Sequence, residues 1–255
     1  MKRIIISITA GLFALLCLVL FDIYPKPWFF LSVLLVWLIT LVSLTAFTRG
    51  KCTEFINIIS LIVFSIFSVS GLISLLEVVF LKYFLMVIGF FIFFFIFMYH
   101  LRGESGALSY KEKPYRRVLL MLWLFNIYSI TSFGFALNVF FPAIPFWIII
   151  VLVSVIIGYI SMINWQMYFN LPINKFFLRG ILIALIVCEL MWVLHLLPLG
   201  YLVLGAMVSW VWYLAQLFIR FDLGRKSIIW RKQIVFLISN FILYFFILYF
   251  FVRWI

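Results

Sequence analysis

Long apolar runs separated by short polar gaps dominate this sequence. Nine runs are long enough to cross a hydrocarbon layer about 30 Å thick, which takes about 20 helical residues. They are residues 4–21, 28–47, 55–73, 83–101, 118–137, 146–164, 180–197, 199–218 and 234–252. Stretches within them, such as residues 84–98, are apolar throughout and do not alternate as membrane-barrel strands do. Because backbone groups in lipid must bond to one another, the pattern predicts an all-α polytopic transmembrane helix bundle.

The ends of several runs are marked by residues that interrupt a helix or carry charge. Residues 55–101 form one apolar stretch that is too long for a single span, and Glu77 and Lys82 mark the predicted turn within 74–82. Two later turns contain helix breakers, namely Pro142, Pro145, Pro198 and Gly200. We therefore expect one integral membrane domain over residues 1–255, built of hairpins with short turns.

The positive charges alternate between the gaps. Of the 19 Lys and Arg residues, 16 lie in every second gap beginning with the N-terminal tail, and 3 lie in the others. Cytoplasmic loops of membrane proteins carry such an excess, so the N-terminus is predicted to be cytoplasmic and, after nine spans, the C-terminus external. The first run continues to Phe21 without a small-residue cleavage site, so we expect a retained span. The expected location is a bacterial cytoplasmic (inner) membrane.

Composition and charge restrict the partners. The chain is 69% hydrophobic and 10% charged, whereas soluble domains are about half apolar and a quarter charged. The net charge of +12 lies in short loops, so we expect anionic lipid headgroups at the basic internal loops 102–117 and 220–233, and no nucleic acid. Retention of these loops inside by their charge explains them more simply than docking to anionic lipid or to a protein partner in a membrane complex, which is the alternative. Three cysteines do not indicate a disulfide framework.

Glu189 is the strongest candidate for a functional residue. It lies ten residues after Arg179, or about 15 Å into the seventh run. An acid at that depth costs about 2.5–3.5 kcal/mol on insertion scales and usually faces a bundle interior. Asn126 in the fifth run and Ser209 in the eighth reach a similar depth. These three residues form our hypothesis for a midplane polar site, and the alternative is a structural hydrogen bond between helices.

Asp22 and His195 are secondary candidates. Asp22 lies in the first external turn, a place similar to that of the catalytic acid in membrane glycosyltransferases that use polyprenyl-linked donors. The turn here is short, so helix capping or a pair with Lys26 explains Asp22 more simply. His195 lies at the external end of the seventh run and His100 at the internal end of the fourth, which excludes a metal site built on both. An interfacial anchor explains His195 better.

The sequence carries no catalytic or cofactor motif. HExxH, GxSxG, P-loop and paired-acid patterns are missing, so we expect no cofactor and no metal site, and a non-enzymatic function is favoured over an enzymatic one. Three classes of function remain open. The leading expectation is a small-solute or lipid transporter, or a flippase-like protein, with a midplane polar site around Glu189. The alternative is a non-catalytic scaffold or subunit of a membrane complex, and the third is an intramembrane lipid-modifying enzyme.

Overall fold

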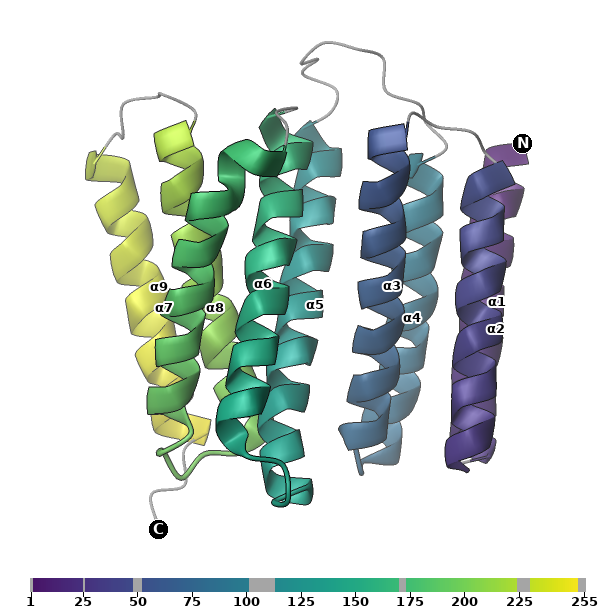
Figure 1. Cartoon of the computed structure of the whole chain (residues 1–255), viewed down its shortest axis with the longest axis horizontal. Helices are drawn as coiled ribbons and strands as arrows, with labels where there is room; N and C mark the ends of the chain where they lie inside the picture. Colours follow the sequence, from purple (N-terminus) through teal and green to yellow (C-terminus); the bar gives the residue numbers. More distant parts are fainter. Residues whose placement is uncertain are drawn as a thin grey trace. The chain divides into compact units, whose positions relative to one another are not determined.

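The computed structural model describes residues 2–24, 26–47, 52–100, 113–169, 173–223 and 230–251. Every regular element within these ranges is helical, which confirms the predicted all-α class. The helices are α1 (Lys2–Ile23), α2 (Pro27–Phe47), α3 (Cys52–Leu75), α4 (Val79–His100), α5 (Lys113–Phe140), α6 (Phe146–Phe169), α7 (Phe177–Leu194), α8 (Tyr201–Leu223) and α9 (Trp230–Phe251), with the 3₁₀ turn η2 (Ile173–Phe176) before α7 (Figure 1).

Eight of the described helices, α1 to α8, are long and apolar enough to cross a membrane. Large apolar side chains cover much of the exposed surface, including Trp28 at 86% and Leu178 at 80% exposure. Water would not tolerate this surface, whereas lipid solvates it. The protein is therefore a multi-pass integral membrane protein. In α9 the qualifying apolar stretch among the described residues, Leu237–Phe246, is shorter, so the ninth span stays a prediction.

The chain divides into two compact units, residues 1–129 and 130–255, and α5 contributes to both. In the first unit α1 packs most closely on α4, while α2 contacts α1 and α3, and α3 contacts α4. Glycine permits the close approach of α1 and α4. A Cβ on Gly11 would lie 2.9 Å from the Phe90 ring, and one on Gly89 would lie 2.7 Å from Leu18.

The second unit is organised around the α6–α7 hairpin. Its two helices meet at Gly158 and Gly180, where a Cβ on Gly158 would lie only 2.9 Å from the Gly180 carbonyl oxygen. α8 follows α7 after a short turn and packs on it. The last part of α5 reaches α8 at Gly205, where Thr131 Oγ1 donates to the Gly205 carbonyl at 3.2 Å.

Most turn predictions are confirmed, with one correction. α3 ends at Leu75 and α4 begins at Val79, so Glu77 lies in the turn as predicted. Lys82 does not, because it is in the first turn of α4, where its ammonium pairs with Asp22 of α1. The turns with Pro142 and Pro145, and with Pro198 and Gly200, lie between helices as expected.

Candidate functional site

Asn126 lies in a buried polar contact between α3 and α5 in the first unit. Its amide Nδ2 donates to Ser65 Oγ at 3.2 Å, and its backbone carbonyl accepts from Ser68 Oγ at 3.4 Å. One turn further, Ser129 Oγ donates to the Ser68 carbonyl at 2.6 Å. All four side chains are at most 1% exposed. We call Ser65, Ser68, Asn126 and Ser129 the α3–α5 seam.

The α3–α5 seam joins two helices by side-chain hydrogen bonds, each of which contributes about 0.6–2 kcal/mol inside a membrane. The spacing of its members, three residues apart on each helix, keeps them on one face. The Asn126 Oδ1 atom has no hydrogen-bond partner among the described residues. Asn126 therefore joins the two helices of the α3–α5 seam through its amide Nδ2 and its backbone carbonyl, while its side-chain oxygen Oδ1 accepts no hydrogen bond from a described residue.

Ser209, the second member of the predicted site, lies on α8 in the second unit. It is 6% exposed, and its hydroxyl donates to the Ala206 carbonyl of its own helix at 2.9 Å. This bond to the preceding turn satisfies the hydroxyl without a partner from another helix.

Glu189, the third member, lies on the exposed side of α7. It lies two positions after the buried Val187, which places the two side chains about 160° apart around the helix. The Glu189 side chain is therefore exposed on the second unit, and the expectation that it faces the interior of the whole bundle stays a prediction. Within α7 (Phe177–Leu194) Glu189 lies between the middle of the helix and its predicted external end, about 9 Å along the helix from His195.

The exposed residues around Glu189 follow a heptad spacing. Leu178, Leu182, Leu185, Glu189 and Trp192 are separated by four, three, four and three residues, and all are exposed. We call this set the Glu189 face. Glu189 has no hydrogen bond or ion pair with any other residue that the structure describes. The grouping of Glu189 with Asn126 and Ser209 stays a prediction, since Asn126 belongs to the other unit.

Asp22 forms an ion pair at the end of the α1–α4 pair. Its Oδ1 atom lies 3.5 Å from Lys82 Nζ, and the two side chains are 30% and 27% exposed. The expected pair with Lys26 is thus replaced by one with Lys82, because α1 and α4 are antiparallel and bring these helix ends together. Such half-exposed pairs contribute about 0.2–1 kcal/mol.

His195 forms the C-terminal cap of α7 and packs among aromatic rings. Its ring centroid lies 4.6 Å from that of Phe146 and 5.3 Å from that of Trp192, and its Nδ1 atom bonds to the Trp192 carbonyl. The ring face is thus packed against aromatic neighbours and one nitrogen is bonded to the helix end, and the role of His195 as an interfacial anchor stays a prediction.

The remaining predictions on ligands fall partly outside the described residues. Within the described residues, no three His, Cys, Asp or Glu side chains lie close enough to bind a metal ion together. Of the loop 102–117, residues 102–112 lie outside the described part, and 113–117 form the start of α5. Of the loop 220–233, residues 224–229 lie outside it. Binding of anionic lipid headgroups there stays a prediction.

Sequence reasoning missed a polar contact between α6 and α8 in the second unit. Trp212 Nε1 donates to Ser161 Oγ at 2.8 Å, and Ser161 Oγ in turn donates to the Ile157 carbonyl at 2.8 Å. One turn further along these helices are Asn164, Trp165 and Gln216, all at most 1% exposed. The signal in the sequence was polar residues at spacings of seven and four within two apolar runs.

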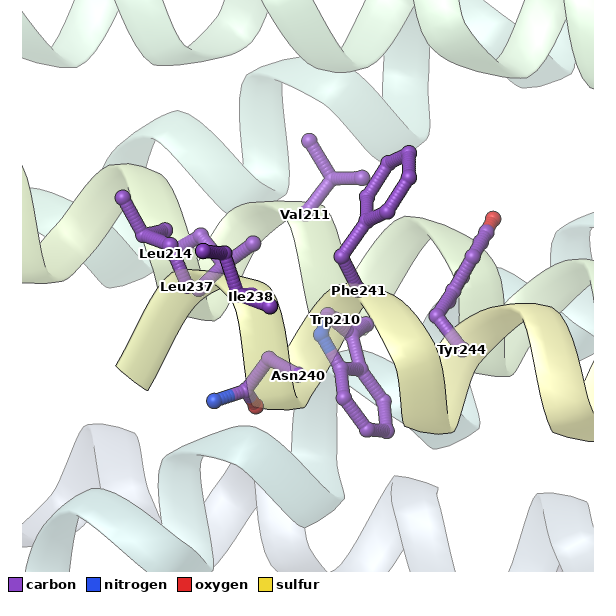
Figure 2. Close-up of a pocket in the computed structure, with 8 residues that line it drawn as sticks. All are labelled: Trp210, Val211, Leu214, Leu237, Ile238, Asn240, Phe241 and Tyr244. Atoms are coloured by element: carbon purple, nitrogen blue, oxygen red, sulfur yellow. The ribbon is translucent and has the colours of Figure 1, made fainter. Parts of the chain in front are cut away.

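A groove between α8 and α9 has a volume of about 420 Å³. It is lined by Trp210, Val211, Leu214, Leu237, Ile238, Asn240, Phe241 and Tyr244. Figure 2 shows that the Asn240 amide and the Tyr244 hydroxyl point in opposite directions, so these two polar groups of the groove do not converge. Sites for chemistry need such convergence, and the groove is therefore an apolar surface feature.

No protein-family model, no curated protein sequence and no solved structure is significantly similar to this chain. The assignment of this chain as a multi-pass integral membrane protein therefore rests on the length and composition of its own helices.

Proposed function

We propose that this integral membrane protein is a non-catalytic subunit of a membrane complex, and that a transmembrane helix of a partner protein binds to the Glu189 face of α7. The observation that supports this proposal is the outward position of Glu189 within an apolar span. We place the complex in a bacterial cytoplasmic membrane, with the basic loops on the inner side.

An unpartnered acid facing lipid is costly. On insertion scales a charged residue near the helix centre costs about 2.5–3.5 kcal/mol, and less toward the interface. A partner helix that presents a Lys, an Arg or another hydrogen-bond donor at the depth of Glu189 removes part of this cost. The heptad spacing of Leu182, Leu185 and Glu189 suits a partner crossing at about 20°, as in left-handed helix pairs. In such pairs a single polar residue fixes the register and the choice of partner.

The proposed partner is another protein and not a second copy of this chain. Every Lys and Arg of this sequence lies in a gap between the apolar runs or in a terminal tail, so a second copy offers no cation at the depth of Glu189. A two-fold dimer through this face would also place the same patches opposite each other, Glu189 against Glu189. Like charges at close range disfavour that arrangement.

The other two classes of function receive less support at these residues. A transport site around Glu189 needs an internal, hydrated position, whereas this side chain is exposed on the second unit. An intramembrane enzyme acting through Asp22 or His195 needs groups free to react, whereas Asp22 is paired with Lys82 and His195 is packed and bonded to its own helix.

The experiment measures binding of defined helices to the full-length protein in phosphatidylcholine vesicles. Two synthetic peptides are compared by fluorescence energy transfer, an all-leucine transmembrane helix and the same helix with one Lys at the depth of Glu189. We expect the Lys peptide to bind the wild-type protein about tenfold more tightly, a difference of about 1.4 kcal/mol. Glu189→Leu should abolish this preference, whereas the control Glu77→Leu, in the α3–α4 turn, should leave it unchanged.

Two results would overturn the proposal. One is an equal preference for the Lys peptide in wild-type protein and in Glu189→Leu. The other is energy transfer between two labelled copies of this chain that disappears in Glu189→Leu, which would assign the face to self-association.

A further inference from the structure

We propose that the interior of the second unit contains a hydrated binding site for a small uncharged hydrogen-bonding molecule, water or a short polyol or amide, between α6 and α8. This proposal is independent of the Glu189 face, which lies on the outside of the same unit. It rests on a row of buried polar side chains with unpaired atoms.

The row follows the same spacing on both helices. On α6 the polar residues Ser154, Ser161 and Trp165 are seven and four residues apart, and on α8 the positions Gly205, Trp212 and Gln216 have the same separations. α6 and α8 run in the same direction, since each is antiparallel to α7. The hydrogen bond between Ser161 and Trp212 fixes their register. Ser154 is therefore level with Gly205, and Trp165 with Gln216.

We call Ser154, Ser161, Asn164, Trp165, Trp212 and Gln216 the α6–α8 file. Its members are at most 3% exposed. Positions four and seven residues apart share a helix face, so the file runs along the contact between the two helices. It extends over about 16 Å, because eleven residues separate Ser154 from Trp165.

Most members of the file lack a hydrogen-bond partner. Within the described residues, both amide atoms of Asn164, both amide atoms of Gln216, the indole Nε1 of Trp165 and the hydroxyl of Ser154 are buried and unpaired. Ser132 Oγ of α5, which approaches Gly205 at the level of Ser154, is unpaired as well. Buried polar groups are costly without a partner and are normally satisfied by protein or by bound molecules.

The chemistry of the file selects its ligand. The unpaired atoms include donors (amide and indole N–H), acceptors (amide carbonyls) and hydroxyls that do both. None of the members is charged, so the file offers no counter-ion for an anion or a cation. Toward the end of α6 the Trp165 ring packs on Phe176 at 6.0 Å, which makes the surroundings apolar. A small neutral molecule with both donors and acceptors fits these groups.

The test uses cysteine reactivity, because the thiolate that reacts forms far more readily in contact with water than in an apolar interior. In full-length protein carrying Cys17→Ala, Cys52→Ala and Cys188→Ala, single variants Ser154→Cys and Gln216→Cys are treated with methyl methanethiosulfonate. The matched controls are Ile163→Cys and Met207→Cys, which are also buried but lie on other sides of α6 and α8. We expect the two file positions to react at least tenfold faster than the controls.

Glycerol and acetamide added as competitors separate the two sources of the ligand. Slower labelling at positions 154 and 216 in their presence means that a small solute occupies the site, and unchanged fast labelling means that water fills it. Labelling as slow as that of the controls would overturn the proposal. Gel-filtration elution of each variant identifies those that fold.

A second measurement does not depend on cysteine substitution. If the amide of Gln216 is hydrated, Gln216→Met removes its bonds and should lower the midpoint of thermal unfolding. If the amide is not hydrated and has no hydrogen-bond partner, the same substitution removes a buried, unsatisfied polar group and should raise the midpoint of thermal unfolding. That result would contradict the proposal.

Discussion

The amide of Asn126 on α5 donates a hydrogen bond to Ser65 Oγ on α3 at 3.2 Å, in the interior of the first unit. Ser129 and Ser68 continue this contact one turn away. A polar residue near mid-span thus joins two helices that are far apart in the sequence, in a setting where neither lipid nor water offers an alternative partner.

Loss of this contact should destabilise the protein. We expect Asn126→Leu to lower the free energy of unfolding by about 1–2 kcal/mol, because the Ser65 hydroxyl loses its donor within an apolar interior. Thermal unfolding in detergent measures the change. Ser74→Ala serves as the control, since Ser74 is exposed and bonds only within its own helix. An unchanged midpoint in Asn126→Leu would show that the α3–α5 seam adds nothing to stability.

The pair Ser161–Trp212 should show energetic coupling. We expect a double-mutant cycle of Ser161→Ala and Trp212→Phe to give about 0.5–2 kcal/mol of interaction energy, since each change removes one partner of the same 2.8 Å bond. The cycle is measured by thermal unfolding of the four proteins. Strictly additive effects would mean that the indole and the hydroxyl do not bond.

Two glycines should differ in their response to alanine. At Gly158 a Cβ would lie 2.9 Å from the Gly180 carbonyl oxygen and 3.1 Å from the Ala184 Cβ, so the α6–α7 pair must move apart. We expect Gly158→Ala to cost about 1–3 kcal/mol, as overpacking usually does. Gly200→Ala is the matched control, because nothing lies within 4 Å of a Cβ there. Equal midpoints for the two variants would contradict the close packing of α6 on α7.

The sequence predicted the helices well because lipid imposes a simple rule. An apolar run of about 20 residues has no alternative to a helix in hydrocarbon, and proline marks several of its ends, as at Pro142 and Pro145. The turn at Glu77 was predicted because the apolar stretch around it is too long for a single helix. Lys82 was wrongly placed in that turn because a long side chain can belong to a helix and still reach a charged partner at the interface.

The candidate site was harder to predict because depth along a helix does not determine the direction of a side chain. Glu189 was placed correctly on α7, but its face depends on which neighbours cover the helix, and α6 packs on the other side of α7, at Gly180 and Ala184. The apolar pattern around Glu189 could not reveal this, since lipid-facing and buried positions are equally apolar in a membrane protein. Gln216 and Asn164 were not predicted as buried polar residues, because both lie near the ends of apolar runs, where polar residues are normally interfacial.

The topology itself provides the last prediction. An export-dependent reporter should be active when fused after Ile255 and inactive when fused after Leu223, because α9 is predicted to carry the chain across the membrane between these points. A cytoplasm-dependent reporter should show the reverse. A fusion after Phe141, in the turn between α5 and α6, is the control for an external position. If both C-terminal fusions report the cytoplasm while the control reports the exterior, α9 lies along the inner surface and the protein has eight spans.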